Sequence, residues 1–352
     1  MSLKRRIIAA GFGLFRATGL HRLAGASLRG RGIILTFHRI RSAQQDVFAP
    51  NALLEITPDF FDAVLPRLRA SGLEIVTLDE AAMRIASGEG APFAALTFDD
   101  GFRDVVTHGL PILERHTAPF TLYIPSGLPA RKSRLWWVEL EEAIRRLDQV
   151  ALEGEVALEG EAPLPARSPA EKSAAFEKIY WRLRGKGESA LMDAVARLRD
   201  QAGVDGAALV EDNCLDWADL QALAAHPLVT IGGHTATHPR LAFLDEAAAE
   251  AEIVQGRLEL ERQLGRPVRH FAYPYGDPGS AGPREFALVE KLGFATAVTT
   301  RPGMIFPEHA GHLHALPRLS VNGLWQDLRA LDVLLSGAPF WLWNRGRRVN
   351  IG

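Results

Sequence analysis

Two short motifs combine carboxylate and imidazole side chains at spacings that suit a metal site. Asp99 and Asp100 follow an apolar run and precede Gly101, and His234 and His238 lie four residues apart after another apolar run. Adjacent side chains leave a strand end in different directions, so one carboxylate can join both imidazoles while the other faces a substrate. Two histidines and one carboxylate leave coordination positions open, as in catalytic zinc sites.

Both motifs also have an ordinary structural interpretation. An Asp after a strand often caps the next helix, and Asp and Gly are favoured turn residues. Two histidines four residues apart also occur on surfaces that bind no metal. The only cysteine, Cys214, rules out a cysteine-based zinc site and an internal disulfide. Any transition metal must therefore be held by histidine and carboxylate.

A third segment, residues 270–277, runs from an apolar strand into a Pro-aromatic-Gly turn. Pro274 fixes its own backbone angle, and Gly276 relieves the turn. The segment either ends the strand or forms a rigid loop that presents a backbone amide and an aromatic surface to a ligand.

In type and order, these motifs resemble those of the polysaccharide deacetylases with a NodB homology domain, also called carbohydrate esterase family four. The resemblance rests on TFDDG at residues 97–101, HTATH at residues 234–238 and PYG at residues 274–276, and by length it covers most of residues 31–321. It implies that Asp99 is the general base and that the backbone amide of Tyr275 stabilises an oxyanion. The implied cofactor is one divalent metal ion, most often Zn²⁺, with Co²⁺, Ni²⁺ or Mn²⁺ as alternatives. Its implied ligands are Asp100, His234 and His238.

Two departures from the family pattern concern the groups around the base. The arginine that usually stands two residues before the proline, where it tethers the base, is replaced by Ala272, and Arg318 is the expected substitute. The usual Leu-x-His motif of the general acid is not cleanly present. His38, at the end of the first strand, is the expected acid, as in the poly-N-acetylglucosamine deacetylase branch. His312 and His314 are the alternatives, and His38 bonded to a loop carbonyl would be inert.

The resemblance implies a metal-dependent hydrolase that removes N-acetyl groups from an N-acetylglucosamine-containing oligo- or polysaccharide, such as a chitooligosaccharide, and releases acetate. The side chains expected to contact this glycan are Tyr273, Pro274, Tyr275 and Trp136. An O-acetyl esterase or a small-molecule amidohydrolase could use the same metal site. A non-catalytic carbohydrate-binding scaffold is a further alternative, although the base and all three metal ligands are present.

The elements that would position these residues alternate along the chain. Short apolar, β-branched runs predict eight strands, at residues 33–37, 74–78, 94–98, 120–124, 229–231, 270–273, 295–299 and 316–321. Helical periodicity between them favours parallel pairing, because a parallel connection needs a long crossover. We therefore expect an α/β fold with a single distorted (β/α) barrel of seven or eight strands.

Three segments fall outside the barrel pattern. We expect an amphipathic N-terminal extension at residues 1–30, a barrel at residues 31–322 and a helical, aromatic and basic tail at residues 323–352. An acidic, Ala-rich insertion with helical periodicity interrupts the barrel at about residues 131–215.

Composition limits the partners. The chain has 352 residues, 47% of them hydrophobic, with 40 basic and 42 acidic side chains and a formal net charge of −2. This is an ordinary globular composition, and it lacks the basic surface that binding to nucleic acid requires. An N-acetylated glycan is the expected partner, and no protein partner is predicted.

The two ends of the chain share a basic and aromatic character. Lys4, Arg5 and Arg6 precede an apolar run near the N-terminus, and residues 340–348 combine Phe and Trp with three arginines. Such segments either pack on the domain or make peripheral contact with a membrane. The apolar run is interrupted early and lacks a convincing cleavage site, so we expect a cytoplasmic protein, at the inner face of the membrane if it is membrane-associated.

Overall fold

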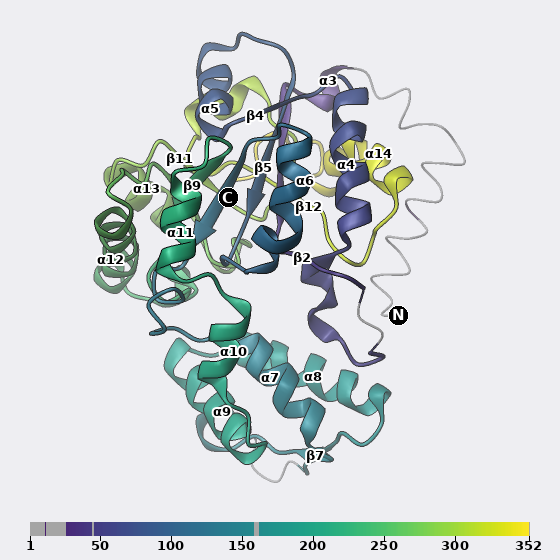
Figure 1. Ribbon diagram of the computed structural model, residues 1–352, viewed down its shortest axis with the longest axis vertical. Helices are drawn as coiled ribbons and strands as arrows, with labels where there is room; N and C mark the ends of the chain where they lie inside the picture. The colour runs from purple at the N-terminus through teal and green to yellow at the C-terminus, as the bar shows by residue number, and fades with distance from the viewer. Residues whose placement is uncertain (1–10, 12–25, 44–45, 158–161, 352) are drawn as a thin grey trace.

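The computed structural model describes residues 11, 26–43, 46–157 and 162–351 (Figure 1). Its centre is an eight-stranded parallel sheet with the strand order β11-β10-β9-β6-β5-β1-β12, and β4 also pairs with β5. The strands are β1 (Gly32–Phe37), β4 (Glu74–Val76), β5 (Phe93–Phe98), β6 (Phe120–Ile124), β9 (Val229–Gly233), β10 (His270–Ala272), β11 (Thr296–Val298) and β12 (Leu319–Ser320). All eight predicted strands are therefore present.

The sheet curls until its two edges meet in one segment. Leu316 forms a parallel bridge with Val298 of β11, and three residues later Leu319 pairs with Leu35 of β1. The distorted (β/α) barrel predicted from the sequence is thus confirmed. Strands β1 and β5 are buried along their whole length, which explains why they appear as continuous apolar runs rather than alternating ones.

Helices cover the outside of the sheet, with α12 and α13 on one side and α4 and α6 on the other (Figure 1). Helix α4 is typical: Thr57 caps its N-terminus, and Phe61, Val64, Leu65 and Leu68 form its buried face. The covering helices are α4 (Pro58–Ala70), α5 (Leu78–Ser87), α6 (Leu110–Arg115), α11 (Trp217–Ala224), α12 (Glu246–Leu264) and α13 (Pro283–Lys291). Strands β2 (Arg39–Ile40) and β3 (Glu55–Ile56) form a small separate pair next to the 3₁₀ helix η1 (Pro50–Leu54).

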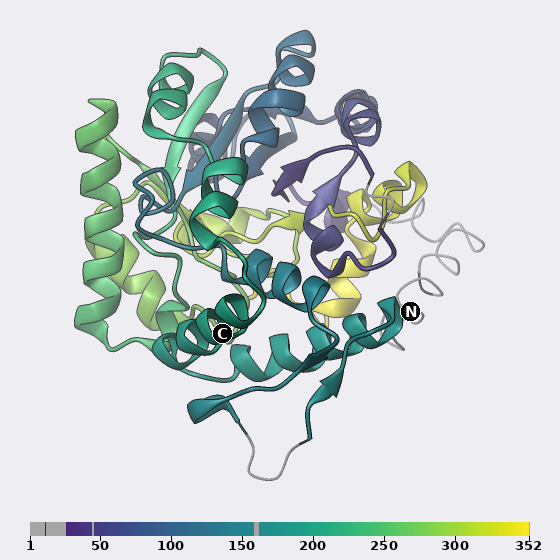
Figure 2. The same cartoon turned by 60° about the horizontal axis from the view of Figure 1, so that its bottom comes forward.

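Between β6 and β9 the chain forms a helical layer across one end of the barrel, drawn in teal in Figure 2. Its elements are α7 (Trp136–Arg146), the strand pair β7 (Gln149–Val150) and β8 (Leu164–Pro165), α8 (Pro169–Arg184), α9 (Glu188–Gln201) and α10 (Gly206–Asn213). We call α7 to α10 the insertion helices. After α10, a bridge between Cys214 and Phe102 joins the chain to the segment that follows β5.

The C-terminal part of the chain forms α14 (Leu328–Leu335) and α15 (Ala338–Trp343). Helix α15 contacts the short helix α3 (Ala26–Arg29), and α14 contacts α4. Most of the amphipathic helix expected at the N-terminus lies outside the described residues. Among the residues that are described, no helix combines the length and apolar character needed to cross a bilayer.

Candidate active site

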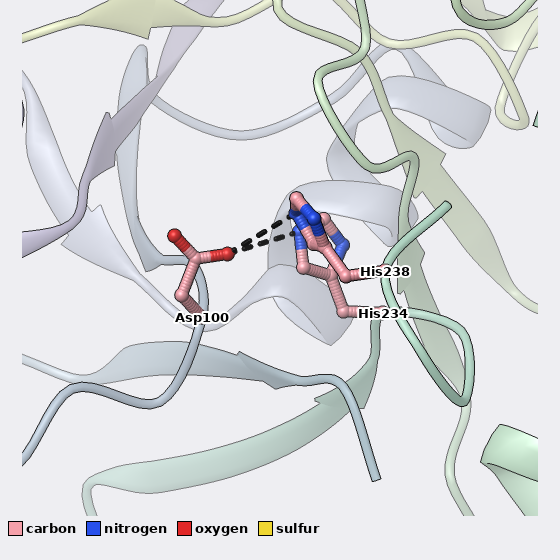
Figure 3. Close-up of side chains that lie close together, drawn as sticks. All are labelled: Asp100, His234 and His238. Carbon is pink, nitrogen blue, oxygen red and sulfur yellow. Dashed lines mark ion pairs between the residues drawn. The ribbon is translucent and has the colours of Figure 1, made fainter. Parts of the chain in front are cut away.

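The three motifs meet at one end of the sheet because each follows a parallel strand. Asp99 and Asp100 come directly after β5, His234 and His238 after β9, and Tyr275 after β10. The carboxyl ends of parallel strands share one edge, where the active sites of (β/α) barrels lie. Figure 3 shows Asp100 facing both imidazoles across this edge.

Asp100, His234 and His238 form a compact, buried cluster. Their potential ligand atoms all lie within 4.8 Å of one another. Asp100 Oδ1 is 3.3 Å from His238 Nε2 and 3.6 Å from His234 Nε2, and the structure shows no hydrogen-bond partner for this buried oxygen among the described residues. A buried carboxylate oxygen without a partner is costly. One divalent cation between the three groups would remove that cost, so the donor set fits the implied metal.

Hydrogen bonds outside the cluster orient the histidines. His234 Nδ1 lies 2.6 Å from the carbonyl oxygen of Ala272 in β10. Because a carbonyl only accepts, Nδ1 carries the proton and Nε2 is left to face Asp100, as in many metal sites. The Thr235 hydroxyl donates to the His234 carbonyl at 2.6 Å and accepts from the His238 amide at 3.0 Å.

Helix α12 supports the loop that carries the histidines. The carboxylate of Glu252 accepts hydrogen bonds from the backbone amides of Ala236 and Thr237 at 3.1 and 2.9 Å. Gly256, one turn further along α12, lies so close that a Cβ atom there would be 2.5 Å from the carbonyl of Thr235. A glycine inside a helix usually weakens it, and here it allows the loop to approach.

The pKa values of the cluster favour metal binding. Burial alone would raise the pKa of Asp100, but the two imidazoles outweigh burial and hold the pKa well below its usual value. Burial lowers the pKa of His238, which keeps its imidazole neutral. A charged carboxylate beside a neutral imidazole is the protonation state that metal ligation requires.

Asp99 is held by a buried arginine. Arg318 donates from Nη1 to Asp99 Oδ1 at 2.7 Å and from Nη2 to Oδ2 at 2.6 Å, and its Nε donates to the Thr299 carbonyl at 2.8 Å. Burial would raise the pKa of Asp99, but the Arg318 guanidinium outweighs it and lowers the pKa. Arg318, the expected substitute for the arginine missing near Pro274, therefore contacts both carboxylate oxygens of Asp99.

Backbone strain is concentrated at this end of the sheet. Seven non-glycine residues in the described part of the chain have positive φ, and four of them belong to the motifs: Asp100, Thr235, His238 and Tyr275, with φ values of 71°, 64°, 67° and 61°. Such conformations persist where the surroundings impose them, and they cluster at functional sites. The structural interpretation of Asp100 as a plain helix cap does not account for this pattern.

The Tyr275 loop lies against the insertion helices. The indole Nε1 of Trp136 donates to the Tyr275 hydroxyl at 2.8 Å, and the Arg184 guanidinium lies 4.2 Å from the Tyr275 ring centre. Arg184 also bonds to Asp277 at 2.5 Å. No described residue accepts a hydrogen bond from the Tyr275 backbone amide, which leaves that donor available to a ligand.

Two contacts between the insertion helices and the site could not be predicted from the sequence. Arg184 reaches the Tyr275 loop from α8, and the ring of Trp137 in α7 lies 5.2 Å from the ring of His238. An aromatic or basic residue in an amphipathic helix gives no local signal of its tertiary partner. The paired tryptophans at residues 136 and 137 were the only available indication.

Three of the four side chains expected to contact the glycan are instead buried. Tyr273 is fully buried, and its hydroxyl donates to the His314 carbonyl at 2.8 Å. Trp136 is 2% exposed and stacks on Tyr180. Both rings serve packing, and Trp136 acts on the site through Tyr275. Pro274 is also buried, whereas Tyr275 is partly exposed and its glycan contact stays a prediction.

The three histidines considered for the acid role lie in different surroundings. His38 is half-buried and follows β1, whose last residue Phe37 pairs with Phe98 of β5, so His38 and Asp99 follow neighbouring strands at the same edge of the sheet. His314 Nε2 is 2.8 Å from the carbonyl of Phe294, which precedes β11 and so lies toward the opposite end of the strands. His312 is half-buried, and its backbone amide donates to the carbonyl of His309 at 2.9 Å. Among the three, the position of His38 suits the acid role.

A polar cleft lies beside the cluster, between α7 and the β2–η1 segment. It encloses about 280 Å³, and Trp137 lines it on the side that meets His238. Its charged lining is balanced and consists of Arg39, Arg41, Arg145, Glu55, Glu141 and Glu142. Burial raises the pKa of Glu141 to about 7. A cleft without a dominant charge favours an uncharged polar ligand over an ionic one.

Comparisons with solved structures show the same fold. The chain is 18% identical to the deacetylase PplD from Streptococcus pyogenes, solved in complex with acetate, with a TM-score of 0.56 over 86% of this chain and 96% of that one. The chain is 18% identical to IcaB from Ammonifex degensii, with a TM-score of 0.55 over 88% of this chain and 97% of that one. It is 15% identical to BC0361, a polysaccharide deacetylase from Bacillus cereus, with a TM-score of 0.52 over 86% of this chain and 68% of that one. A comparison with curated proteins finds no significant match.

A family model matches one part of the chain. Residues 193–297 match the family model described as polysaccharide deacetylase. The matched part contains the His234–His238 motif and the Tyr275 loop, while Asp99, Asp100 and Arg318 lie outside it and reach the same site through the fold. In this matched segment and in its fold, the chain is therefore similar to the polysaccharide deacetylases.

Proposed function

We propose that this protein is a metal-dependent N-deacetylase that acts on an N-acetylglucosamine-containing oligo- or polysaccharide and releases acetate. One observation carries the proposal: a buried Asp-His-His cluster lies beside a second carboxylate that an arginine holds in place. The first provides a metal site and the second a base, which are the two requirements of hydrolysis by an activated water. The balanced charge of the neighbouring cleft supports a neutral acetylated glycan as the substrate.

Different residues around the cluster perform different steps of amide hydrolysis. Asp100, His234 and His238 would hold a divalent ion, which when bound would lower the pKa of a water molecule and polarise a carbonyl group. Asp99 accepts the proton of the attacking water, and Arg318 keeps that carboxylate ionised and oriented. The Tyr275 amide donates to the oxygen on which negative charge develops.

Breaking the carbon–nitrogen bond requires an acid, because an amine does not leave as an anion. His38, as an imidazolium, donates the proton to the leaving nitrogen. Its half-buried position at the same edge of the sheet as Asp99 supports this role. The products are acetate and a free sugar amine. In an O-acetyl esterase the leaving group is an alcohol, so the same residues would act with less need of an acid.

The experiment that tests the proposal measures metal content and acetate release on the same preparation. The purified protein is assayed on N-acetylglucosamine oligomers and, separately, on acetylated xylan, before and after chelation and after Zn²⁺ is restored. We expect stoichiometric metal and acetate release from the oligomers that chelation abolishes and Zn²⁺ restores. Acetate release from xylan alone would identify an O-acetyl esterase, and full activity of the metal-free protein would refute the site.

The cytoplasmic location expected from the sequence remains a prediction of this proposal. Fractionation of cells that produce the full chain, with an activity assay on each fraction, would test it.

A further inference from the structure

Three consecutive large apolar side chains are exposed at the end of α15. Trp341, Leu342 and Trp343 are 47%, 58% and 60% exposed, whereas Phe340, which faces inward from the same helix, is 6% exposed. Isolated exposed apolar residues are common on soluble proteins, but contiguous ones mark an interaction site. Two of these three are tryptophans, the side chain that combines a large apolar surface with a hydrogen-bond donor.

Arginines follow these aromatic side chains closely along the chain. Arg345 and Arg347 are exposed, whereas Arg348 pairs with Glu308 at 3.0 Å and lies over the Phe306 ring. The chain turns back after α15 because Arg345 and Gly346 both have positive φ, of 53° and 79°, and the Gly346 amide donates to the Trp341 carbonyl at 2.7 Å. The turn therefore keeps the backbone of Arg345 and Arg347 close to the end of α15. We call residues 341–343 with Arg345 and Arg347 the Trp-Arg patch.

Helix α15 packs directly on α3. Gly337, which precedes α15, has a φ of 76°, and a Cβ atom there would lie 1.8 Å from the carbonyl oxygen of Leu28 in α3. The backbones of the two helices are thus in direct contact, and this contact fixes α15 and the exposed residues at its end on the fold.

We propose that the Trp-Arg patch docks this protein peripherally on an anionic lipid bilayer. Indoles favour the boundary between headgroups and acyl chains, and each arginine near an anionic membrane contributes about fivefold to binding. A protein partner is the competing occupant, because tryptophan and arginine are also enriched at protein interfaces; a surface used only for a protein partner would leave this protein unbound to vesicles. A second copy of this chain would bring arginine against arginine across a two-fold axis. No described helix can cross the bilayer, so the contact is peripheral for the described part of the chain.

Binding of the full chain to vesicles tests this proposal. Vesicles of phosphatidylcholine alone are compared with vesicles that contain phosphatidylglycerol, by flotation and by quenching of tryptophan emission with brominated lipid. We expect the protein to bind the anionic vesicles and to be released by salt. Trp341→Ser with Trp343→Ser should weaken binding at least about tenfold, the effect of withdrawing one buried indole. Arg345→Gln with Arg347→Gln should reduce it by about 25-fold, about fivefold for each arginine.

A matched control distinguishes the effect of the Trp-Arg patch from the effect of any exposed tryptophan. Trp181 in α8 is 63% exposed and lies in the insertion helices, so Trp181→Ser should bind vesicles like the unmodified protein. Circular dichroism and acetate release, which do not depend on the patch, verify that each variant is folded. Vesicle binding that is the same in all variants would overturn the proposal. Absence of vesicle binding by the unmodified protein would also overturn the proposal. This holds even if the protein forms a dimer that the patch substitutions disrupt.

Discussion

At the scale of residues, the site combines groups that the sequence predicted with groups that it could not. Asp99, Asp100, His234 and His238 could be predicted to meet because each follows an apolar strand, and parallel strands share an edge. Arg318 could be proposed because a buried base needs a cation and its usual position holds Ala272. The residues that support Tyr275 and His238 were beyond prediction, since their contacts arise only when the insertion helices pack.

The role of Asp99 can be separated from that of the metal ligands. Asp99→Asn should retain the metal, because Asp99 is not part of the cluster, and should lower kcat by about two orders of magnitude, as expected for loss of a general base. Elemental analysis and steady-state kinetics measure the two effects. His238→Ala is the matched variant and should lose both metal and activity. An Asp99→Asn protein with normal kcat would contradict the assignment of the base.

Arg318 is predicted to act through its shape as well as its charge. Arg318→Lys keeps the positive charge but cannot donate to both oxygens of Asp99, so one buried oxygen is left without its partner. We expect kcat to fall by about 10- to 100-fold, the equivalent of one unsatisfied buried hydrogen bond, while KM changes little. Arg318→Met should also unfold more easily, because it leaves a buried charge unpaired. Equal kcat in Arg318→Lys and the unmodified protein would show that the paired hydrogen bonds from Arg318 to the two oxygens of Asp99 are unimportant for catalysis.

At the scale of elements, the helices and strands position the site through close backbone contacts. The strands were predictable from apolar runs, and helices such as α4 from their periodicity and caps. Gly256 inside α12 could not be explained from the sequence, because helix propensity alone favours alanine at this position. The structure provides one, because the histidine loop passes directly over this position.

Gly256→Ala tests this contact, because helix propensity predicts that the substitution raises the free energy of unfolding and packing predicts that it lowers it. Propensity predicts a gain of about 1 kcal/mol in the free energy of unfolding, whereas forcing a methyl group against the Thr235 backbone costs about 1–3 kcal/mol. We expect a net loss of stability, together with weaker Zn²⁺ binding because the loop carries both histidines. Urea unfolding and a Zn²⁺ titration measure these effects. Gln255→Ala, at an exposed neighbouring position, is the control and should change neither.

At the scale of the whole molecule, stability depends on pH through a buried histidine far from the cluster in sequence. His309 in the 3₁₀ helix η5 (Pro307–Gly311) is 1% exposed, and its Nδ1 accepts a hydrogen bond from the Phe306 amide at 3.0 Å. Burial lowers its pKa to about 4. The unfolded chain therefore takes up a proton at a higher pH than the folded protein does. The stability from neutral His309 is complete above about pH 6.5 and is lost as the pH falls toward 4.

The matched variant is His309→Gln, because glutamine at this helix position can still accept from the Phe306 amide but does not titrate. The difference in unfolding free energy between the two proteins should change by up to about 3 kcal/mol between pH 7 and pH 4, with the unmodified protein losing more. Urea unfolding of the metal-free proteins at both pH values measures it. Parallel pH profiles would show that His309 is accessible to solvent when folded.

The barrel itself was predictable from eight apolar runs, whereas the order of assembly that it imposes was not. The segment that joins β11 to β1 also carries Arg318, so closure of the sheet and placement of the base depend on the same residues. During synthesis, the cluster residues are complete once His238 has emerged, but the tether of Asp99 comes 80 residues later. A growing chain therefore completes the proposed metal site before it acquires the residue that holds the proposed base. On the proposed function, activity should appear only when the last strand has joined the sheet.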